Sequence, residues 1–177
     1  MMRAARGLLL AAVTAAALLG PAASGAQELK PFAPGSLKEI QAARAGRPFV
    51  LAFWSLTCTY CHEEFALFSA LRKKYPALDI VLVATDTPAE SEALSDTLRH
   101  YGLEGIESWV FADEFAERLR YDVDPKWGGE LPRTYFYASD HGRRAQSGRL
   151  DRQRLEDWIK QQFGPAPPQG RQESKAR

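Results

Sequence analysis

The sequence predicts an α/β fold in which a mixed central sheet is flanked by helices. Two continuous apolar runs, at 49–54 and 80–84, are typical of strands that are covered on both faces. Apolar residues with helical spacing follow each run, which places helices after these strands. Two strand-like segments then flank the turn at 139–142, as in a hairpin, and a last helical segment follows. This order of elements is typical of an α/β domain with helices on both faces of its sheet.

The first 26 residues are built like a secretory signal peptide. Arg3 and Arg6 precede the apolar run 7–20, and the small residues after it fit a signal peptidase site with cleavage after Ala26. The alternative is an uncleaved membrane anchor, but this run is shorter than the ~20 residues that span a bilayer. The arginine-bearing start and clean apolar core look bacterial. We therefore expect export to the periplasm, with the membrane as a partner only if the signal is uncleaved.

The charge balance gives no indication of a nucleic acid partner. Removing Arg3 and Arg6 from the 23 basic residues leaves 21, against 22 acidic residues, so the mature chain is nearly neutral. The chain has only two cysteines, although the expected compartment tolerates disulfides. A small scaffold held together by several disulfides is therefore excluded.

The first half of the mature chain begins with a predicted linker and helix. Residues 27–35 hold two prolines and are expected to link the signal to a domain that spans 36–163. Ser36 and Glu39 have the spacing of a capping box and open a helix to about residue 45, where Gly46 stops it. A second helix follows the strand at 49–54. Its core-facing residues are expected to be Phe65, Phe68, Leu71 and Tyr75.

The second half continues the alternation of helices and strands. A helix is expected at 87–101, a short strand at 109–111 and a further helix at 113–121. After the hairpin, Asp151 is expected to cap the last helix. The Pro-, Gln- and Arg-rich segment 164–177 is expected to be a disordered tail.

A pair of cysteines lies at the turn between the strand at 49–54 and the next helix. Cys58 and Cys61 have C-x-x-C spacing, and Cys58 falls at or near the first turn of that helix. The free N–H groups and the positive dipole end there stabilise a thiolate, which is the reactive form of cysteine. A purely structural disulfide is the alternative, but closing so short a loop gives little stabilisation. We expect a thiol–disulfide redox site in which Cys58 attacks and Cys61 resolves the mixed disulfide.

Two segments about seventy residues apart carry a family pattern. They are Phe53-Trp54-x-x-x-Cys58-x-x-Cys61 and Leu131-Pro132-Arg133-Thr134-Tyr135-Phe136-Tyr137, the latter followed by Asp140-His141-Gly142. This pattern resembles the thioredoxin superfamily, and most closely its TlpA/ResA-like secreted thiol–disulfide oxidoreductases. The resemblance covers roughly 36–163 and implies a thioredoxin-like fold. It also implies a cis bond before Pro132, a Leu131 backbone open to an extended substrate, and Trp54 beside the dithiol.

The sequence departs from the family pattern at two places. Ala52 stands where thioredoxins carry a buried Asp, so a proton-handling carboxylate must come from elsewhere. Asp86 lies close to where ResA-like proteins hold a functional acid, and its alternative role is to cap the next helix. The segment 125–130 makes the connection to Pro132 about five residues longer than usual. Trp127 within it belongs either to a flexible lip that contacts substrate or to a packed loop.

A c-type haem carrier is the competing interpretation. Cys58-Thr59-Tyr60-Cys61-His62 is also a C-x-x-C-H haem-attachment motif. The only methionines are Met1 and Met2, so after cleavage a second haem ligand would have to be His100 or His141. This interpretation leaves the strand before the motif and Leu131-Pro132 unexplained. In the redox interpretation, His62 is a first-turn residue that can help the thiolate when protonated.

The expected function is that of a thiol–disulfide oxidoreductase without a bound cofactor. It would exchange the Cys58/Cys61 pair with cysteine pairs of exported proteins. The resemblance implies a membrane electron-transfer protein that keeps it reduced, so substrate reduction is the expected direction. Reduction potentials of C-x-x-C proteins range from about −270 to about −120 mV, and Thr59-Tyr60 does not fix the value here.

Overall fold

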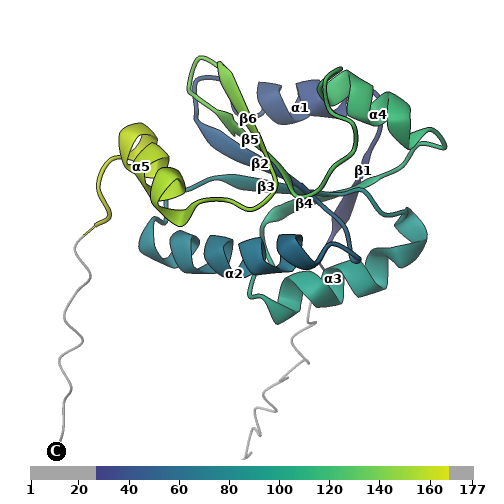
Figure 1. Ribbon diagram of the computed structural model, residues 1–177, viewed down its shortest axis with the longest axis horizontal. Helices are drawn as coiled ribbons and strands as arrows, with labels where there is room; N and C mark the ends of the chain where they lie inside the picture. The colour runs from purple at the N-terminus through teal and green to yellow at the C-terminus, as the bar shows by residue number, and fades with distance from the viewer. Residues whose placement is uncertain (1–26, 168–177) are drawn as a thin grey trace, which may run out of the picture.

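The computed structural model describes residues 27–167, which form a six-stranded sheet between helical layers (Figure 1). The strand order is β1-β4-β3-β2-β5-β6. Strands β1, β4, β3 and β2 run parallel, while β5 is antiparallel to β2 and β6 is antiparallel to β5. The predicted mixed α/β fold is therefore confirmed. The predicted signal peptide at 1–26 and positions 168–177 of the predicted tail lie outside the described residues.

The elements follow the predicted order, with one strand added at the start. The strands are β1 Leu29–Phe32, β2 Phe49–Trp54, β3 Ile80–Ala84, β4 Glu107–Phe111, β5 Arg133–Tyr137 and β6 Arg143–Ser147. The helices are α1 Ser36–Ala42, α2 Thr59–Lys74, α3 Ser91–His100, α4 Ala116–Val123 and α5 Arg152–Phe163, with a 3₁₀ turn η1 at Pro88–Glu90. The predicted strands, the hairpin and the helix that carries the cysteines are confirmed.

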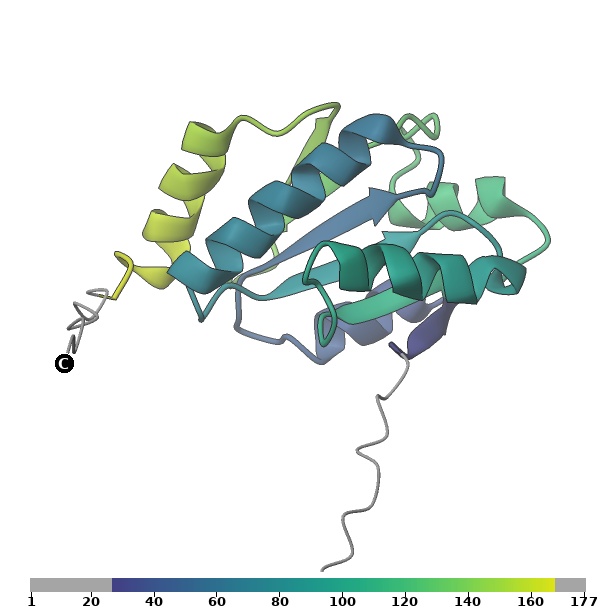
Figure 2. The same ribbon diagram turned by 90° about the horizontal axis from the view of Figure 1, so that it is seen from below.

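The two faces of the sheet are covered by different helices. Helices α2, α3 and α5 pack on one face, and α1 and α4 pack on the other (Figures 1 and 2). We call the two apolar clusters beneath them the α2-side core and the α4-side core. The central strand β2 is buried along its whole length and contributes alternate side chains to both cores. It therefore directs Trp54 into the α2-side core and Phe53 into the α4-side core.

The segment 27–35 is not a linker, contrary to the sequence prediction. Leu29–Phe32 pairs in parallel with β4 as an edge strand, and Phe32 is fully buried in the α4-side core. An edge strand tolerates Pro31 because one of its sides needs no hydrogen-bonding partner. The Gln27 side chain also donates to the carbonyl of Ile106 and accepts from the N–H of Gly105. The strand is only four residues long and contains a proline, so its sequence carries little strand signal.

Three helix ends also differ from the prediction. Ser36 does not cap α1, because its hydroxyl accepts from the N–H of Ala33 and so closes the turn before the helix. That helix ends at Ala42, three residues early, and its N-cap is Gly35 with φ of 96°. Asp113 accepts from the N–H of Phe115 in the turn before α4 rather than capping that helix.

Of the predicted tail at 164–177, the structure describes residues 164–167. Ala166 is partly buried and packs against the α2-side core, so the chain stays ordered beyond residue 164. Asp151 caps α5 as predicted, because its carboxylate accepts from the N–H of Arg154.

Candidate active site

The two cysteines lie at the carboxyl end of the central strand. Residues 55–57 connect β2 to α2, and Cys58 is the N-cap of α2 with an extended backbone. Its Sγ accepts from the N–H of Cys61 at 3.2 Å, and the two residues form a disulfide with Cα atoms 5.3 Å apart. Cys58 is partly exposed, whereas Cys61 is 1% exposed. The predicted placement of Cys58 at the start of the helix is therefore confirmed, and it is the more accessible of the two cysteines.

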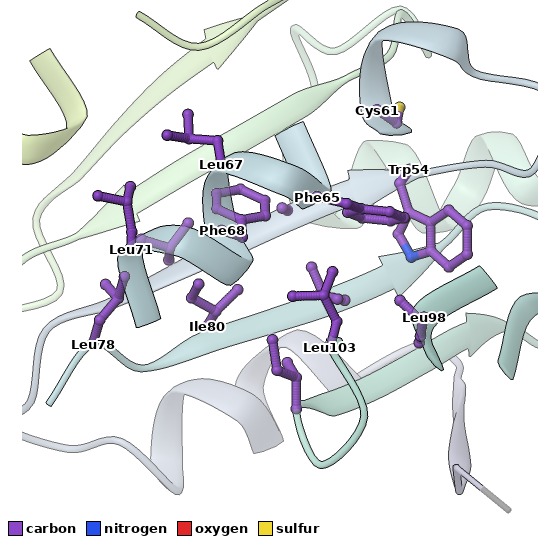
Figure 3. Close-up of a cluster of buried hydrophobic side chains, with 14 of the residues drawn as sticks. Trp54, Cys61, Phe65, Leu67, Phe68, Leu71, Leu78, Ile80, Leu98 and Leu103 are labelled. Carbon is purple, nitrogen blue, oxygen red and sulfur yellow. The ribbon is translucent and has the colours of Figure 1, made fainter. Parts of the chain in front are cut away.

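Trp54 underlies the first turns of the dithiol helix. Its indole is buried and packs edge-on against Phe65 of α2, with ring centroids 4.8 Å apart. Figure 3 shows Trp54 and Cys61 at the same end of the α2-side core. Within residues 27–167, the indole Nε1 has no hydrogen-bond partner. Trp54 is thus a core residue that packs in the same cluster as Cys61, in agreement with its expected place beside the dithiol.

A cis-proline loop lies beside the end of β2. The Leu131–Pro132 bond is cis, as predicted. Antiparallel pairing sets Arg133 opposite Phe53, which brings Pro132 to the level of Trp54, where the strand enters the dithiol turn. The carbonyl of Pro132 accepts from the N–H of Gly148 at 2.9 Å. No backbone hydrogen bond to Leu131 is formed within the part of the chain that the structure describes, so these groups are available to an extended chain.

Asp86 holds the turn that leads to the first cysteine. Its carboxylate accepts from the Ser55 hydroxyl at 3.0 Å and from the N–H of Leu56 at 3.2 Å. Burial raises the pKa of Asp86, although these hydrogen bonds oppose the shift. It does not cap the next helix, because Thr87 and Glu90 form the capping box there. The capping alternative is therefore wrong, and Asp86 lies at the dithiol turn.

Trp127 belongs to a packed loop and not to a projecting lip. Its side chain is 5% exposed, and its ring lies 4.7 Å from that of Phe53 in the α4-side core. The indole N–H donates to the carbonyl of Glu130 and closes the loop on itself. Gly129 has φ of 101°, and a Cβ there would meet the Arg120 side chain at 3.1 Å. The glycine is therefore required by the conformation of the loop and is not a sign of flexibility.

A buried ion pair fixes this loop to the strand after the proline. Asp124 accepts from Arg133 at 2.8 Å, from Tyr135 at 3.3 Å and from the N–H of Lys126 at 3.1 Å. Burial alone would raise the pKa of Asp124, but these hydrogen bonds and the charges of Arg133 and Arg143 hold it below its ordinary value. Burial also raises the pKa of Tyr135 to about 12. This cluster is a structural support for the cis-proline loop.

Glu64 is the site residue that the sequence analysis missed. It lies one helical turn after Cys61 and is 5% exposed. Its Oε1 accepts from the N–H of Leu150 at 2.9 Å, and burial raises its pKa to about 7 despite this bond. The pair Glu63-Glu64 looks like a solvated helix start. The available signal was the spacing of Glu64 from Cys61, because residues three apart share one face of a helix.

Three further observations concern metal ligands, His62 and the character of the helices. Among residues 27–167, no group of three or more His, Cys, Asp and Glu side chains is placed to hold a metal ion. The His62 ring packs 6.0 Å from Phe65 and 5.9 Å from Tyr101, with its Nε2 buried. In the same range of residues, no helix has the length and apolar character needed to cross a membrane.

Fold and site together define a class: a thioredoxin-like α/β domain with a C-x-x-C pair at the start of its second helix and a cis-proline beside it. The structure is similar to that of a secreted disulfide oxidoreductase of Mycobacterium tuberculosis homologous to E. coli DsbE. The TM-score is 0.55 and the identity 23%, over 67% of this chain and 84% of that one.

Two other solved structures are also similar to this one. A thioredoxin-family thiol:disulfide interchange protein of Chlorobium tepidum gives a TM-score of 0.56 at 14% identity, over 70% of this chain and 85% of that one. A DsbF homologue of Corynebacterium diphtheriae gives a TM-score of 0.53 at 16% identity, over 68% of this chain and 75% of that one. No protein-family model matches the sequence, and comparison with curated proteins gives no match. The thioredoxin-like fold expected from the resemblance is thus confirmed by the structure.

Proposed function

We propose that the protein is a thiol–disulfide oxidoreductase whose reactive group is the Cys58/Cys61 pair. The observation that carries the proposal is the placement of a partly exposed Cys58 at a helix N-terminus, bonded to a buried Cys61 and close to a cis-proline loop. A helix N-terminus stabilises a thiolate and so raises the fraction of cysteine that can react. The names of the similar structures, which are disulfide oxidoreductases and interchange proteins, support the same assignment.

The reaction exchanges one disulfide for another. In the reducing direction, the Cys58 thiolate attacks a substrate disulfide, one substrate thiolate leaves, and a mixed disulfide forms. The Cys61 thiol then loses its proton, and its sulfur attacks Sγ of Cys58. The second substrate thiolate leaves as the Cys58–Cys61 disulfide forms, so two electrons pass from the dithiol to the substrate. The oxidising direction is the reverse of these steps.

Glu64 is the group placed to receive the proton of the buried thiol. Cys61 has no direct access to solvent, and Glu64 lies on the same helical face one turn later. A carboxyl group with a pKa of about 7 can both take and release a proton near neutral pH. Asp86 holds the turn before the first cysteine through Ser55 and Leu56. We assign Glu64 to proton transfer and Asp86 to positioning of the turn.

We further propose that the protein acts in the periplasm as a reductant of exported proteins with cysteine pairs. The signal-like segment 1–26 and the secreted M. tuberculosis protein among the similar structures support this location. A membrane electron-transfer protein would return the disulfide to the dithiol. A measured reduction potential tests the direction: a value near −270 mV favours a reductant, and a value near −120 mV an oxidant.

Turnover of a protein disulfide tests the assignment itself. The wild-type protein should reduce insulin in the presence of a chemical reductant, and C58S should lose this activity. C61S should retain the first step and accumulate mixed disulfides, because no thiol remains to resolve them. We also expect Cys58 to be alkylated much faster than Cys61 in the reduced protein near neutral pH. Full insulin reduction by C58S would contradict the proposal.

The haem alternative makes a different prediction for the same motif. His141 cannot join His62 at one haem, since it packs against Phe49 at the start of β2, about 17 Å of strand away from the cysteine end. His100 would then have to serve as the second ligand. Protein exported in a host that matures c-type cytochromes should show no Soret band and no increase in mass by one haem. A covalently attached haem would favour the carrier over the oxidoreductase.

A further inference from the structure

A small pocket opens beside the buried carboxyl group of Glu64. It has a volume of about 100 Å³. Its walls are Tyr60, Glu63, Glu64 and Leu67 of α2 together with Arg149 and Leu150 of the segment between β6 and α5. A water molecule occupies about 30 Å³ in the liquid, so the pocket has room for a few of them. It is thus large enough to hold water between Glu64 and the surface.

The outer side of this pocket is covered by one ion pair. The Arg149 guanidinium forms a salt bridge with the Glu63 carboxylate and lies over the Tyr60 ring, 5.2 Å from its centroid. The Arg149 side chain remains 64% exposed, so it lies between the pocket and bulk solvent. We call this ion pair the Arg149 cover.

The backbone around Arg149 is fixed at both of its neighbours. The N–H of Gly148 donates to the carbonyl of Pro132, and the N–H of Leu150 donates to Glu64. Gly148 has φ of 75°, which favours glycine at this position. The segment therefore joins the cis-proline loop to the carboxyl group of Glu64, and it holds Arg149 over the pocket.

Proton transfer at Glu64 requires such a path. When the disulfide forms, Cys61 gives its proton to Glu64, and this proton must reach water before the next cycle. The titratable and charged groups at the pocket are Tyr60 and Glu63 from α2 and Arg149 from the segment after β6, with Cys61 one turn before Glu64. Burial is the largest influence on the pKa of Glu64, and only the hydrogen bond from Leu150 opposes it, so access of water is the main control on this group.

We propose that this pocket is the route by which Glu64 exchanges its proton with solvent, and that Arg149 is a positioning residue that limits entry of water. The role of this route in catalysis rests on the proposed function, but access of water to Glu64 can be measured without turnover. The proton passes from the Cys61 thiol to the Glu64 carboxylate and from there to water in the pocket. No electron moves in this step.

The test is a titration of Glu64 in the oxidised protein, where no cysteine titrates alongside it. Carbon-13 labelling of glutamate gives the titration curves, and the curve missing from E64Q belongs to Glu64. The double variant E63Q/R149A removes both charges of the cover together, so its effect reports hydration. We expect the Glu64 pKa to fall from about 7 toward the ordinary 4.5, by about one unit or more. The matched control D96N/R99A removes an exposed ion pair on α3 and should leave the value unchanged.

A second variant keeps the proposal testable if the double variant does not fold. Y60A opens the pocket from its other wall without any change of charge, and it should lower the Glu64 pKa in the same direction. Cooperative unfolding shows that each variant is folded. If both are folded and neither lowers the pKa of Glu64, the pocket is not the route of proton exchange. Insulin reduction by the wild-type protein is measured separately. Its absence would overturn the proposed function and leave the pocket result standing.

Discussion

Two buried carboxyl groups lie on opposite sides of the sheet, and their pKa values are shifted in opposite directions. Glu64, on the α2 side, is buried with a single backbone hydrogen bond, and its pKa is raised to about 7. Asp124, on the α4 side, is similarly buried, but it binds Arg133 and lies close to Arg143, and its pKa is lowered. Burial raises the pKa in both cases, and only Asp124 has cationic partners that lower it.

This difference separates a group that can do chemistry from a group that supports the fold. A carboxylate paired with arginine keeps its charge at every pH near neutrality and acts as a fixed structural element. A carboxylate without such a partner can change its protonation near pH 7. The comparison predicts that variants on the α4 side lower stability, whereas E64Q slows the reaction without a loss of stability at pH 7. The following four predictions test it, from the largest expected effect to the smallest.

W127A should cost about 4 kcal/mol of unfolding free energy, because it removes a buried indole from the α4-side core. The ratio of the rates with a protein disulfide and with a small disulfide should stay at the wild-type value. Urea unfolding and the two rate assays measure these quantities. Y121A, which truncates an exposed aromatic side chain of α4, is the control. A stable W127A with a selective loss of protein reduction would restore the lip interpretation.

D124N should lower the unfolding free energy by about 3 kcal/mol, since it leaves Arg133 without its main buried counter-charge. The rate per folded molecule should change little. D122N, at an exposed position two residues earlier, serves as the control and should be close to wild type. A large loss of rate in fully folded D124N would mean that this cluster takes part in the reaction.

The two carboxylates should also give stability opposite dependences on pH. Folding raises the pKa of Glu64, so its stabilising contribution is present below pH 4.5 and is lost as the pH rises through about 7. Asp124 contributes above its ordinary pKa of 3.8, and that contribution is lost as the pH falls further. Relative to wild type, E64Q should gain about 2–3 kcal/mol between pH 4.5 and pH 7. Parallel stability curves for the two proteins would contradict the raised pKa.

E64Q should slow resolution of the mixed disulfide about tenfold at pH 7, because Cys61 loses its proton acceptor. Its stability at that pH should not fall. Stopped-flow mixing of the reduced protein with a fluorescent disulfide substrate separates attack by Cys58 from release by Cys61. E92Q, on the exposed side of α3, is the matched control. An unchanged second step would remove Glu64 from the mechanism.

The sequence predicted the parts of the molecule that rest on local patterns. Apolar runs located β2 and β3, and the C-x-x-C pair and Leu131-Pro132 located both halves of the site. The edge strand β1 was missed because its stability comes from pairing with β4, more than seventy residues later. Glu64 was missed because its burial depends on Leu150, which comes from the far end of the chain. Long-range contacts of this kind leave no local signal.

The alternation of side chains along β2 limits where residues can be inserted into the chain. Phe53 and Trp54 are neighbours that face opposite cores, and the cysteines follow at a fixed offset from them. One residue inserted within 49–54 would exchange the two faces from that point on and misdirect the indole beneath α2. The same insertion in the exposed turn before the strand, at 45–47, would leave the alternation intact. Natural and designed relatives should therefore vary in length before β2 and keep a constant count from Phe49 to Cys61.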